Sequence, residues 1–76
     1  MGFGIGEYDR ARDRVVSAHG ELWASRLDSV REFVEYGPTY SRGVWDNVSR
    51  AFHALGKPDM ESAEFWWSEV LSGVSA

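Results

Sequence analysis

The sequence predicts a small all-α protein, a helical bundle in which one long helix is packed by two short ones. Apolar residues recur with the 3.6-residue period of an α-helix over most of the chain. Glycine with proline just beyond it marks two internal stops, in "YGPT" and "LGKPD". The length of 76 residues, 43% of them hydrophobic, allows one core and therefore one domain. The helices are expected at about residues 7–36, 40–55 and 59–73, within a single helical domain spanning 7–76.

The first six residues, "MGFGIG", are expected to form a flexible N-terminal leader because every second one is glycine. The long helix over 7–36 follows. Its apolar residues keep one phase through Gly20, which favours a continuous helix. Glycine inside a helix costs about 1 kcal/mol relative to alanine, so a break at His19–Gly20 is the alternative. The in-phase residues are Tyr8, Ala11, Val15, Leu22, Val30 and Phe33, and Val16, Trp23, Leu27 and Val34 widen the stripe.

The second helix, over 40–55, has the cleanest amphipathic pattern in the chain. Thr39 or Ser41 can cap its N-terminus. Polar side chains occupy the opposite or flanking positions. The apolar side comprises Val44, Trp45, Val48, Ala51, Phe52 and Leu55.

The third helix, over 59–73, carries the stretch "ESAEFWWSEVL" and has Asp59 as a natural N-cap. The 100° step between helical neighbours cannot direct three adjacent aromatic rings to one core. Trp67 is therefore expected in the core, Trp66 at its margin and Phe65 outside. The predicted apolar face comprises Met60, Ala63, Trp67, Val70, Leu71 and Val74.

Helix lengths raise the question of what covers the N-terminal half of the long helix. At 1.5 Å per residue the long helix would extend about 45 Å, roughly twice the length of either short helix. If the third helix folds back beside the second, a strip made of Tyr8, Ala11, Val15 and Val16 is left bare and available for a dimer. If the third helix runs on over it, the strip is a core edge. We expect a homodimer, because association supports a small core.

Three polar residues interrupt the apolar stripe of the long helix at intervals of seven, namely Arg12, His19 and Arg26. In one interpretation the arginines extend their stems over the stripe and keep their charges in water, and His19 is a satisfied interface residue. In the other, this buried polar column pairs with Glu61 and Glu64 of the third helix or with the acids of a second copy, which would fix the register of packing.

The distribution of charge argues against nucleic acid as a direct ligand. The net charge is −4, and residues 1–57 are neutral in sum. The whole excess lies in residues 58–76, which hold four acids and no base. Phosphate binding needs a basic face, so a DNA-binding helix-turn-helix regulator that reads DNA with the third helix is disfavoured. A protein partner with a basic surface is the better expectation.

Several chemical classes lack their usual sequence signatures. The chain has no cysteine, and its two histidines have no metal-ligand spacing. No serine lies in a nucleophile elbow. We therefore expect no enzyme, no cofactor and no metal site. The sequence shows neither a secretory signal nor a run long enough to span a membrane, so we expect a cytoplasmic protein without a membrane partner.

The leading functional hypothesis is a non-enzymatic protein-binding protein that acts through the third helix. Phe65 and Trp66 serve as anchors, and Glu61, Glu64 and Glu69 serve as steering charges. One form is an inhibitor of a nucleic-acid-handling protein, of the phage anti-defence type, which is a guess by category. The alternative is a structural dimerisation module or assembly subunit without a foreign target. An enzymatic hypothesis survives only if His19 and a glutamate of the third helix converge in a cleft.

Overall fold

The computed structural model describes residues 5–36 and 40–75, and within them every regular element is an α-helix. The elements are α1 (Ile5–His19), α2 (Glu21–Tyr36), α3 (Tyr40–Gly56) and α4 (Met60–Ser75). The all-α prediction is confirmed, but the predicted number of helices is wrong, because the expected long helix is two. Of the leader expected at 1–6, residues 1–4 lie outside the described part, and so does Thr39, one of the two candidate caps.

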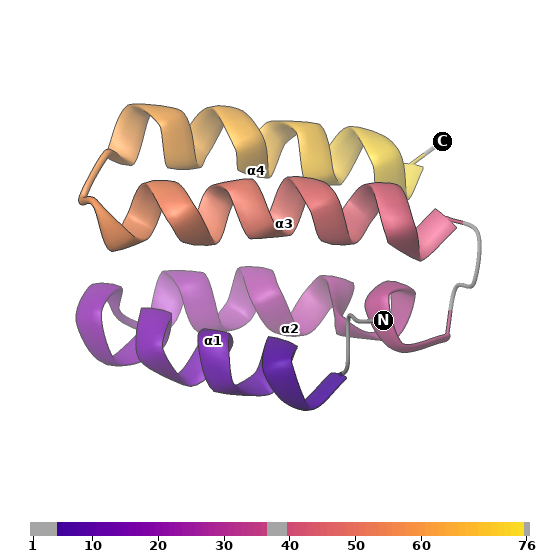
Figure 1. Cartoon of the computed structure of the whole chain (residues 1–76), viewed down its shortest axis with the longest axis horizontal. Helices are drawn as coiled ribbons and strands as arrows, with labels where there is room; N and C mark the ends of the chain where they lie inside the picture. Colours follow the sequence, from indigo (N-terminus) through magenta and orange to yellow (C-terminus); the bar gives the residue numbers. More distant parts are fainter. Residues whose placement is uncertain (1–4, 37–39, 76) are drawn as a thin grey trace.

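The four helices form two antiparallel hairpins that stack on each other (Figure 1). The α1–α2 hairpin makes the lower layer of this view and the α3–α4 hairpin makes the upper one. Successive helices run in opposite directions, so α2 and α4 run the same way. The molecule measures 30 × 23 × 22 Å. A straight helix of 30 residues would be about 45 Å long and could not fit within these dimensions.

The reversal between α1 and α2 occurs at Gly20. Its φ is +94°, in the left-handed region that residues with a side chain avoid. The Gly20 N–H donates to the Val16 carbonyl at 2.9 Å and completes the last turn of α1. The alternative of a break at His19–Gly20 is therefore the observed one, and the expected continuous helix is corrected.

Two arginine–aspartate pairs join the arms of this first hairpin. Arg12 donates to both carboxylate oxygens of Asp28 at 3.1 and 3.0 Å, and Arg31 donates to both oxygens of Asp9 at 2.9 Å. The residues of the two pairs are 16 and 22 positions apart, and both pairs are centred on Gly20. The hydrogen bonds from Arg31 lower the pKa of Asp9 below its ordinary value. Each pair fixes the direction and register of α2 against α1.

A buried tyrosine adds a third contact across the same hairpin. The Tyr8 side chain is fully buried, and its hydroxyl donates to the Leu27 carbonyl of α2 at 2.6 Å. Burial is the main cause that raises the pKa of this phenol. The ring also meets Trp45 and Phe52 of α3, with centroid separations of 5.6 and 6.0 Å. Tyr8 therefore joins the two layers.

The strip on the N-terminal half of the first helix is not bare. Tyr8 and Val15 are 0% and 7% exposed, and Ala11 and Val16 are half-buried. The hypothesis of an exposed dimer strip is corrected, because α2 folds back beside α1 and α3 packs above it. The residues form part of the core and its edge.

The core confirms most of the predicted apolar faces. On α3, all six predicted residues are buried or half-buried. On α4, Ala63, Trp67 and Val70 are buried, and the Trp67 ring meets Trp23 of α2 edge-on at 5.6 Å. This aromatic contact brings α2 and α4 together on the side of the bundle away from Tyr8.

Four large apolar residues that the sequence assigned to core-facing stripes are instead exposed. Leu22 and Phe33 of α2 are 59% and 39% exposed, and Met60 and Leu71 of α4 are 41% and 45% exposed. The prediction is wrong for these four residues. The part of each helix's circumference that is buried in the bundle is narrower than its apolar stripe.

The turn between α3 and α4 confirms the cap predicted at Asp59. Its carboxylate accepts a hydrogen bond from the Ser62 N–H at 3.1 Å, and its carbonyl accepts one from the Ala63 N–H at 3.0 Å. The hydrogen bond with Ser62 lowers the pKa of Asp59. The cap fixes where α4 begins and thus the rotation of its faces.

The conformation at Gly20 is tested by replacing it with alanine. No atom lies within 4 Å of the added Cβ, so the cost comes from the left-handed backbone alone and is expected to be about 1–2 kcal/mol. Gly43→Ala is the matched control, because Gly43 lies in α3 with equal space around it, and alanine should stabilise that helix by about 0.5–1 kcal/mol. Urea denaturation of both variants measures the difference. A Gly20→Ala variant as stable as the parent would contradict the observed reversal.

Stability is expected to fall in acid because Asp9 and Asp59 have lowered pKa values in the fold. The contribution of such a carboxylate is complete above its unfolded pKa, near 3.8, and is lost as the pH falls through the folded value. Thermal unfolding between roughly pH 6 and pH 2 should show this decline. In the variants Asp9→Asn and Asp59→Asn the decline should be shallower, and an unchanged pH profile would contradict the two assigned hydrogen-bonded states.

Candidate functional site

The three adjacent aromatic residues of α4 point in three different directions, as predicted. Trp67 is 4% exposed and lies in the core, Trp66 is half-buried, and Phe65 is 55% exposed. Successive residues of a helix are rotated by about 100°, so fixing Trp67 against Trp23 turns Phe65 away from the bundle.

The exposed Phe65 ring is supported by its neighbours. It meets Trp66 nearly edge-on, with centroids 5.0 Å apart and planes at 80°. The Trp66 ring is in turn covered by the Arg50 guanidinium of α3, at 4.8 Å from its centroid. This cation–π contact ties the aromatic pair to a second helix. The pair is consequently a supported surface feature and not a loose side chain.

Acidic residues flank the aromatic pair. Glu61 and Glu69 lie one helical turn before and after Phe65, and both are exposed and without an ion-pair partner among the described residues. Glu64 differs, because its carboxylate accepts a hydrogen bond from Arg26 of α2 at 2.8 Å. We call Glu61, Phe65, Trp66 and Glu69 the acidic-aromatic surface. Of the three predicted steering charges, two are free and one is held by α2.

The polar column predicted on the first helix is divided by the reversal at Gly20. Arg12 and His19 belong to α1 and Arg26 belongs to α2. All three are half-buried, and no polar side chain in the described ranges is fully buried. The expectation of a continuous buried column is therefore wrong.

Arg12, His19 and Arg26 each have a different hydrogen-bond partner. The Arg26 guanidinium bonds Glu64, as one interpretation anticipated, and lies 4.6 Å from the centroid of the Trp23 ring. His19 Nε2 donates to the Leu55 carbonyl at 3.3 Å. Glu61, the other expected partner, makes no such pair. The Arg26–Glu64 pair fixes the register of α2 against α4.

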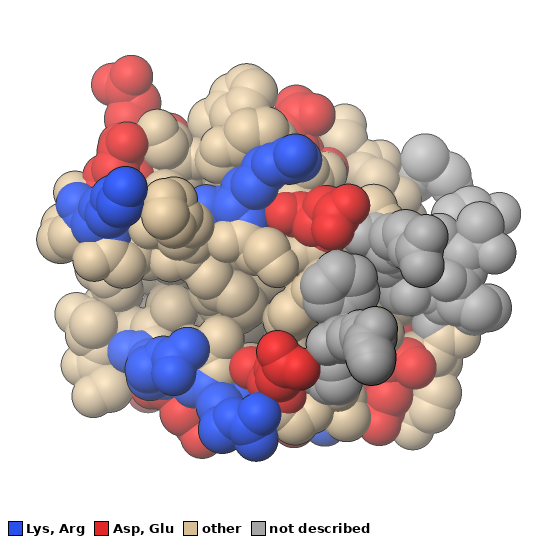
Figure 2. All heavy atoms as spheres, viewed as in Figure 1, with Lys and Arg blue, Asp and Glu red and all other residues tan. Residues whose placement is uncertain are grey.

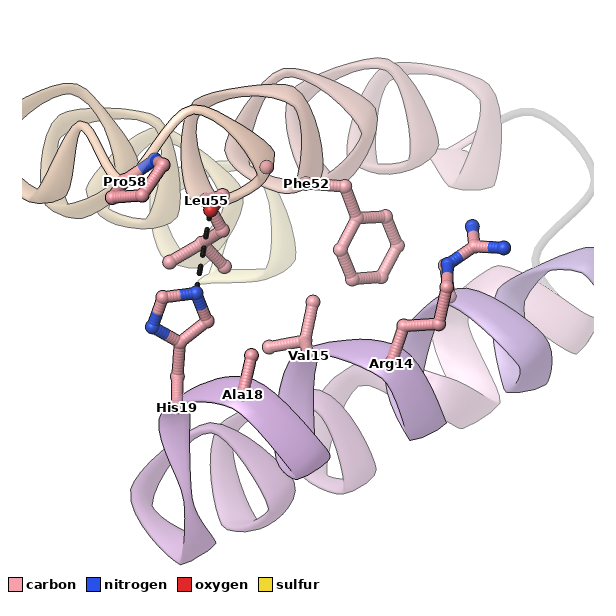
Figure 3. A pocket seen from close by; sticks show the side chains of 9 residues that line it. Arg14, Val15, Ala18, His19, Phe52, Leu55 and Pro58 are labelled. Atoms are coloured by element: carbon pink, nitrogen blue, oxygen red, sulfur yellow. Dashed lines mark hydrogen bonds between the residues drawn. The ribbon is translucent and has the colours of Figure 1, made fainter.

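A pocket of about 490 Å³ between α1 and α3 was not predicted (Figure 3). Phe52 points into it from α3, and Val15 and His19 point into it from α1. The seam remains open because Ala11 and Ala18 are too small to fill it. Two alanines seven residues apart on one helix face are the signal that could have indicated the pocket.

The pocket continues along the same seam as a second hollow of about 370 Å³, which Glu7, Arg10 and Trp45 help to line. Figure 2 shows this face as a largely uncharged band whose borders carry both basic and acidic side chains. The seam therefore offers mainly contact with apolar groups, and its borders carry charges of both signs.

The described surroundings of His19 lack the carboxylate that the enzymatic hypothesis requires. Among the described residues, no carboxylate lines the 490 Å³ pocket, and Glu64 is engaged with Arg26 on the α2–α4 side of the bundle. His19 and a glutamate of α4 therefore do not converge. Within the ranges that the structure describes, no three side chains of metal-binding type are grouped closely enough to hold an ion.

Comparisons with known proteins return no similarity: no family model, curated protein or solved structure matches this chain. None of the helices described combines the length and the apolar character that crossing a bilayer requires. What the protein does is therefore inferred from its surfaces.

The different positions of Phe65 and Trp67 give a direct test of the acidic-aromatic surface. Phe65→Ala should change the free energy of unfolding by no more than about 0.5 kcal/mol, because the ring is largely in solvent. Trp67→Ala should cost about 3–5 kcal/mol, because it empties a core position. Chemical denaturation followed by circular dichroism measures both. A large loss on removing Phe65 would show that the ring is structural.

Proposed function

We propose that this protein is a non-enzymatic protein-binding protein and that it engages a partner with a basic surface through the acidic-aromatic surface of α4. The observation that carries the proposal is Phe65, whose ring is 55% exposed although Trp66 and Arg50 support it from below. A large apolar ring held out in water between two unpaired carboxylates adds little to the stability of the fold.

The arrangement has the composition of an interface hot spot. Aromatic anchors contribute most when little motion is lost on binding, and the contacts of Phe65 and Trp66 restrict their motion in advance. Glu61 and Glu69 surround the anchor with negative charge. Such charges attract a basic partner over several ångströms and accelerate its association. The net charge of −4 acts in the same direction.

The favoured form of this proposal is an inhibitor of a nucleic-acid-handling protein. Such proteins present basic surfaces to phosphate groups. An acidic helix with an aromatic anchor could cover a surface of this kind and exclude the nucleic acid. Phage anti-defence inhibitors are the class of protein that this form of the proposal has in mind. The acidic and aromatic side chains of α4 are what support it.

Site-specific photo-crosslinking in the cells that produce the chain tests the proposal. A photoreactive phenylalanine analogue at position 65 should link to one discrete protein, because the ring is expected to lie at the centre of the interface. Mass spectrometry then identifies the linked protein, and the complex is reconstituted. Phe65→Ala should weaken it by roughly 30-fold, which corresponds to a hot-spot loss of about 2 kcal/mol.

Two control positions make the result specific. The analogue at Glu32, on the exposed side of α2, reports background, and the analogue at Ala18 reports occupancy of the α1–α3 pocket. Linkage from Ala18 but not from position 65 would contradict the proposal and assign the partner to the pocket. Linkage from position 65 only to a second copy of the chain would favour the structural dimerisation module instead.

A further inference from the structure

Four of the exposed apolar residues of α2 and α4, namely Leu22, Phe33, Met60 and Leu71, are arranged around one ion pair. Leu22 and Phe33 lie within about 40° of Arg26 around α2, at 100° per residue. By the same reckoning, Met60 and Leu71 lie within about 40° of Glu64 around α4. Arg26 and Glu64 bond each other across the seam between these helices. The four side chains therefore border that seam on its solvent side, in agreement with their exposure.

The two helices carry these four apolar residues at the same spacing from the ion pair. On α2, Leu22 is four residues before Arg26 and Phe33 is seven after it. On α4, Met60 is four residues before Glu64 and Leu71 is seven after it. Since α2 and α4 run in the same direction (Figure 1) and the ion pair aligns them, the residues form two matched rows. We call this surface the α2–α4 face.

The floor of the α2–α4 face is formed by packed aromatic rings. Trp23 and Trp67 meet edge-on beneath it at 5.6 Å, and Arg26 lies over the Trp23 ring at 4.6 Å. The face thus combines apolar side chains at both ends with one positive and one negative group at its centre.

We propose that the α2–α4 face is the interface of a homodimer, with the two-fold axis in the plane of the face and parallel to the helices. This axis places α2 of one subunit over α4 of the other. Leu22 then meets the partner subunit's Met60, and Phe33 meets the partner subunit's Leu71. At the centre, Arg26 meets the partner subunit's Glu64. The face is complementary to itself, because apolar residues meet apolar residues and the positive group meets the negative one. An isologous interface requires this self-complementarity.

The charges select this axis over the other in-plane two-fold. An axis perpendicular to the helices would place α2 antiparallel to the partner's α2 and bring the two Arg26 groups close together. Like charges in a partly desolvated interface oppose association, whereas alternating charges fix its register. A second copy is therefore the occupant that the pattern fits, and the added apolar burial supports a domain of only 76 residues.

The dimer leaves the acidic-aromatic surface free. Phe65 follows Glu64 in sequence and is rotated from it by about 100° around α4, away from the α2–α4 face. Each dimer would present two such surfaces. The dimer therefore does not depend on which foreign partner binds the acidic-aromatic surface.

The first test is molar mass by light scattering over a wide range of concentration, at low and high salt. The parent chain is expected to be dimeric. Leu22→Glu and Leu71→Glu should each give monomers with unchanged circular dichroism, because both side chains are exposed in the isolated subunit. Phe65→Glu is the matched control and should remain dimeric. A monomeric parent, or a dimer that both variants leave intact, would overturn the proposal.

The second test fixes the orientation and uses the absence of native cysteine. Leu22→Cys and Met60→Cys are prepared separately, mixed and treated with a mild oxidant. The mixture should yield a disulfide-linked heterodimer, and Leu22→Cys alone should not link. Efficient linkage of Leu22→Cys with Phe33→Cys instead would indicate the antiparallel arrangement and overturn the proposed axis.

Discussion

The reversal of the chain at Gly20 is the constraint on which the remaining structure depends. It converts an amphipathic run of about 30 residues into a hairpin, which Asp9–Arg31, Arg12–Asp28 and the Tyr8 hydroxyl hold together. The reversal also sets α2 beside α4, where Arg26 reaches Glu64 and Trp23 meets Trp67. Because those contacts fix the rotation of α4, they also determine that Phe65 faces solvent.

The surfaces of the molecule follow from how much of each apolar stripe the hairpins bury. The α1–α2 hairpin buries Tyr8 and Val15 but leaves Leu22 and Phe33 outside. Three sides of α4 belong to three different surfaces. One side lies in the core, a second belongs to the α2–α4 face, and a third carries the acidic-aromatic surface. In the proposed assembly α4 is used on three sides, which accounts for the many aromatic and acidic residues of this short segment. The two proposed contacts, with a second copy and with a foreign partner, use different sides of α4 and are therefore compatible.

Local features of the structure were predictable from the sequence, whereas tertiary ones, apart from the Arg26–Glu64 pair, were not. Helical period and capping depend on residues that are close together in the sequence. They determine the apolar face of α3, the Asp59 cap and the directions of Phe65 and Trp67. The break at Gly20 was predicted only as the alternative to a continuous helix, because a single left-handed residue redirects the helix axis without changing the spacing of apolar residues. The informative signal was the mirror arrangement of Asp9 and Arg12 with Arg31 and Asp28 about that glycine. The exposure of Leu22, Phe33, Met60 and Leu71 depends on which helix faces meet in space, and no local sequence pattern records this.

A distance measurement between α1 and α2 tests the central claim most directly. Spin labels attached to cysteines introduced at Glu7 and Glu32, both exposed, report this separation by pulsed electron paramagnetic resonance. An excess of unlabelled chain removes contributions between subunits. The hairpin predicts a single distance well below 30 Å, the longest dimension of the molecule. A distance near 38 Å, about the span of 25 residues in a straight helix, would contradict the reversal at Gly20 and the arrangement built on it.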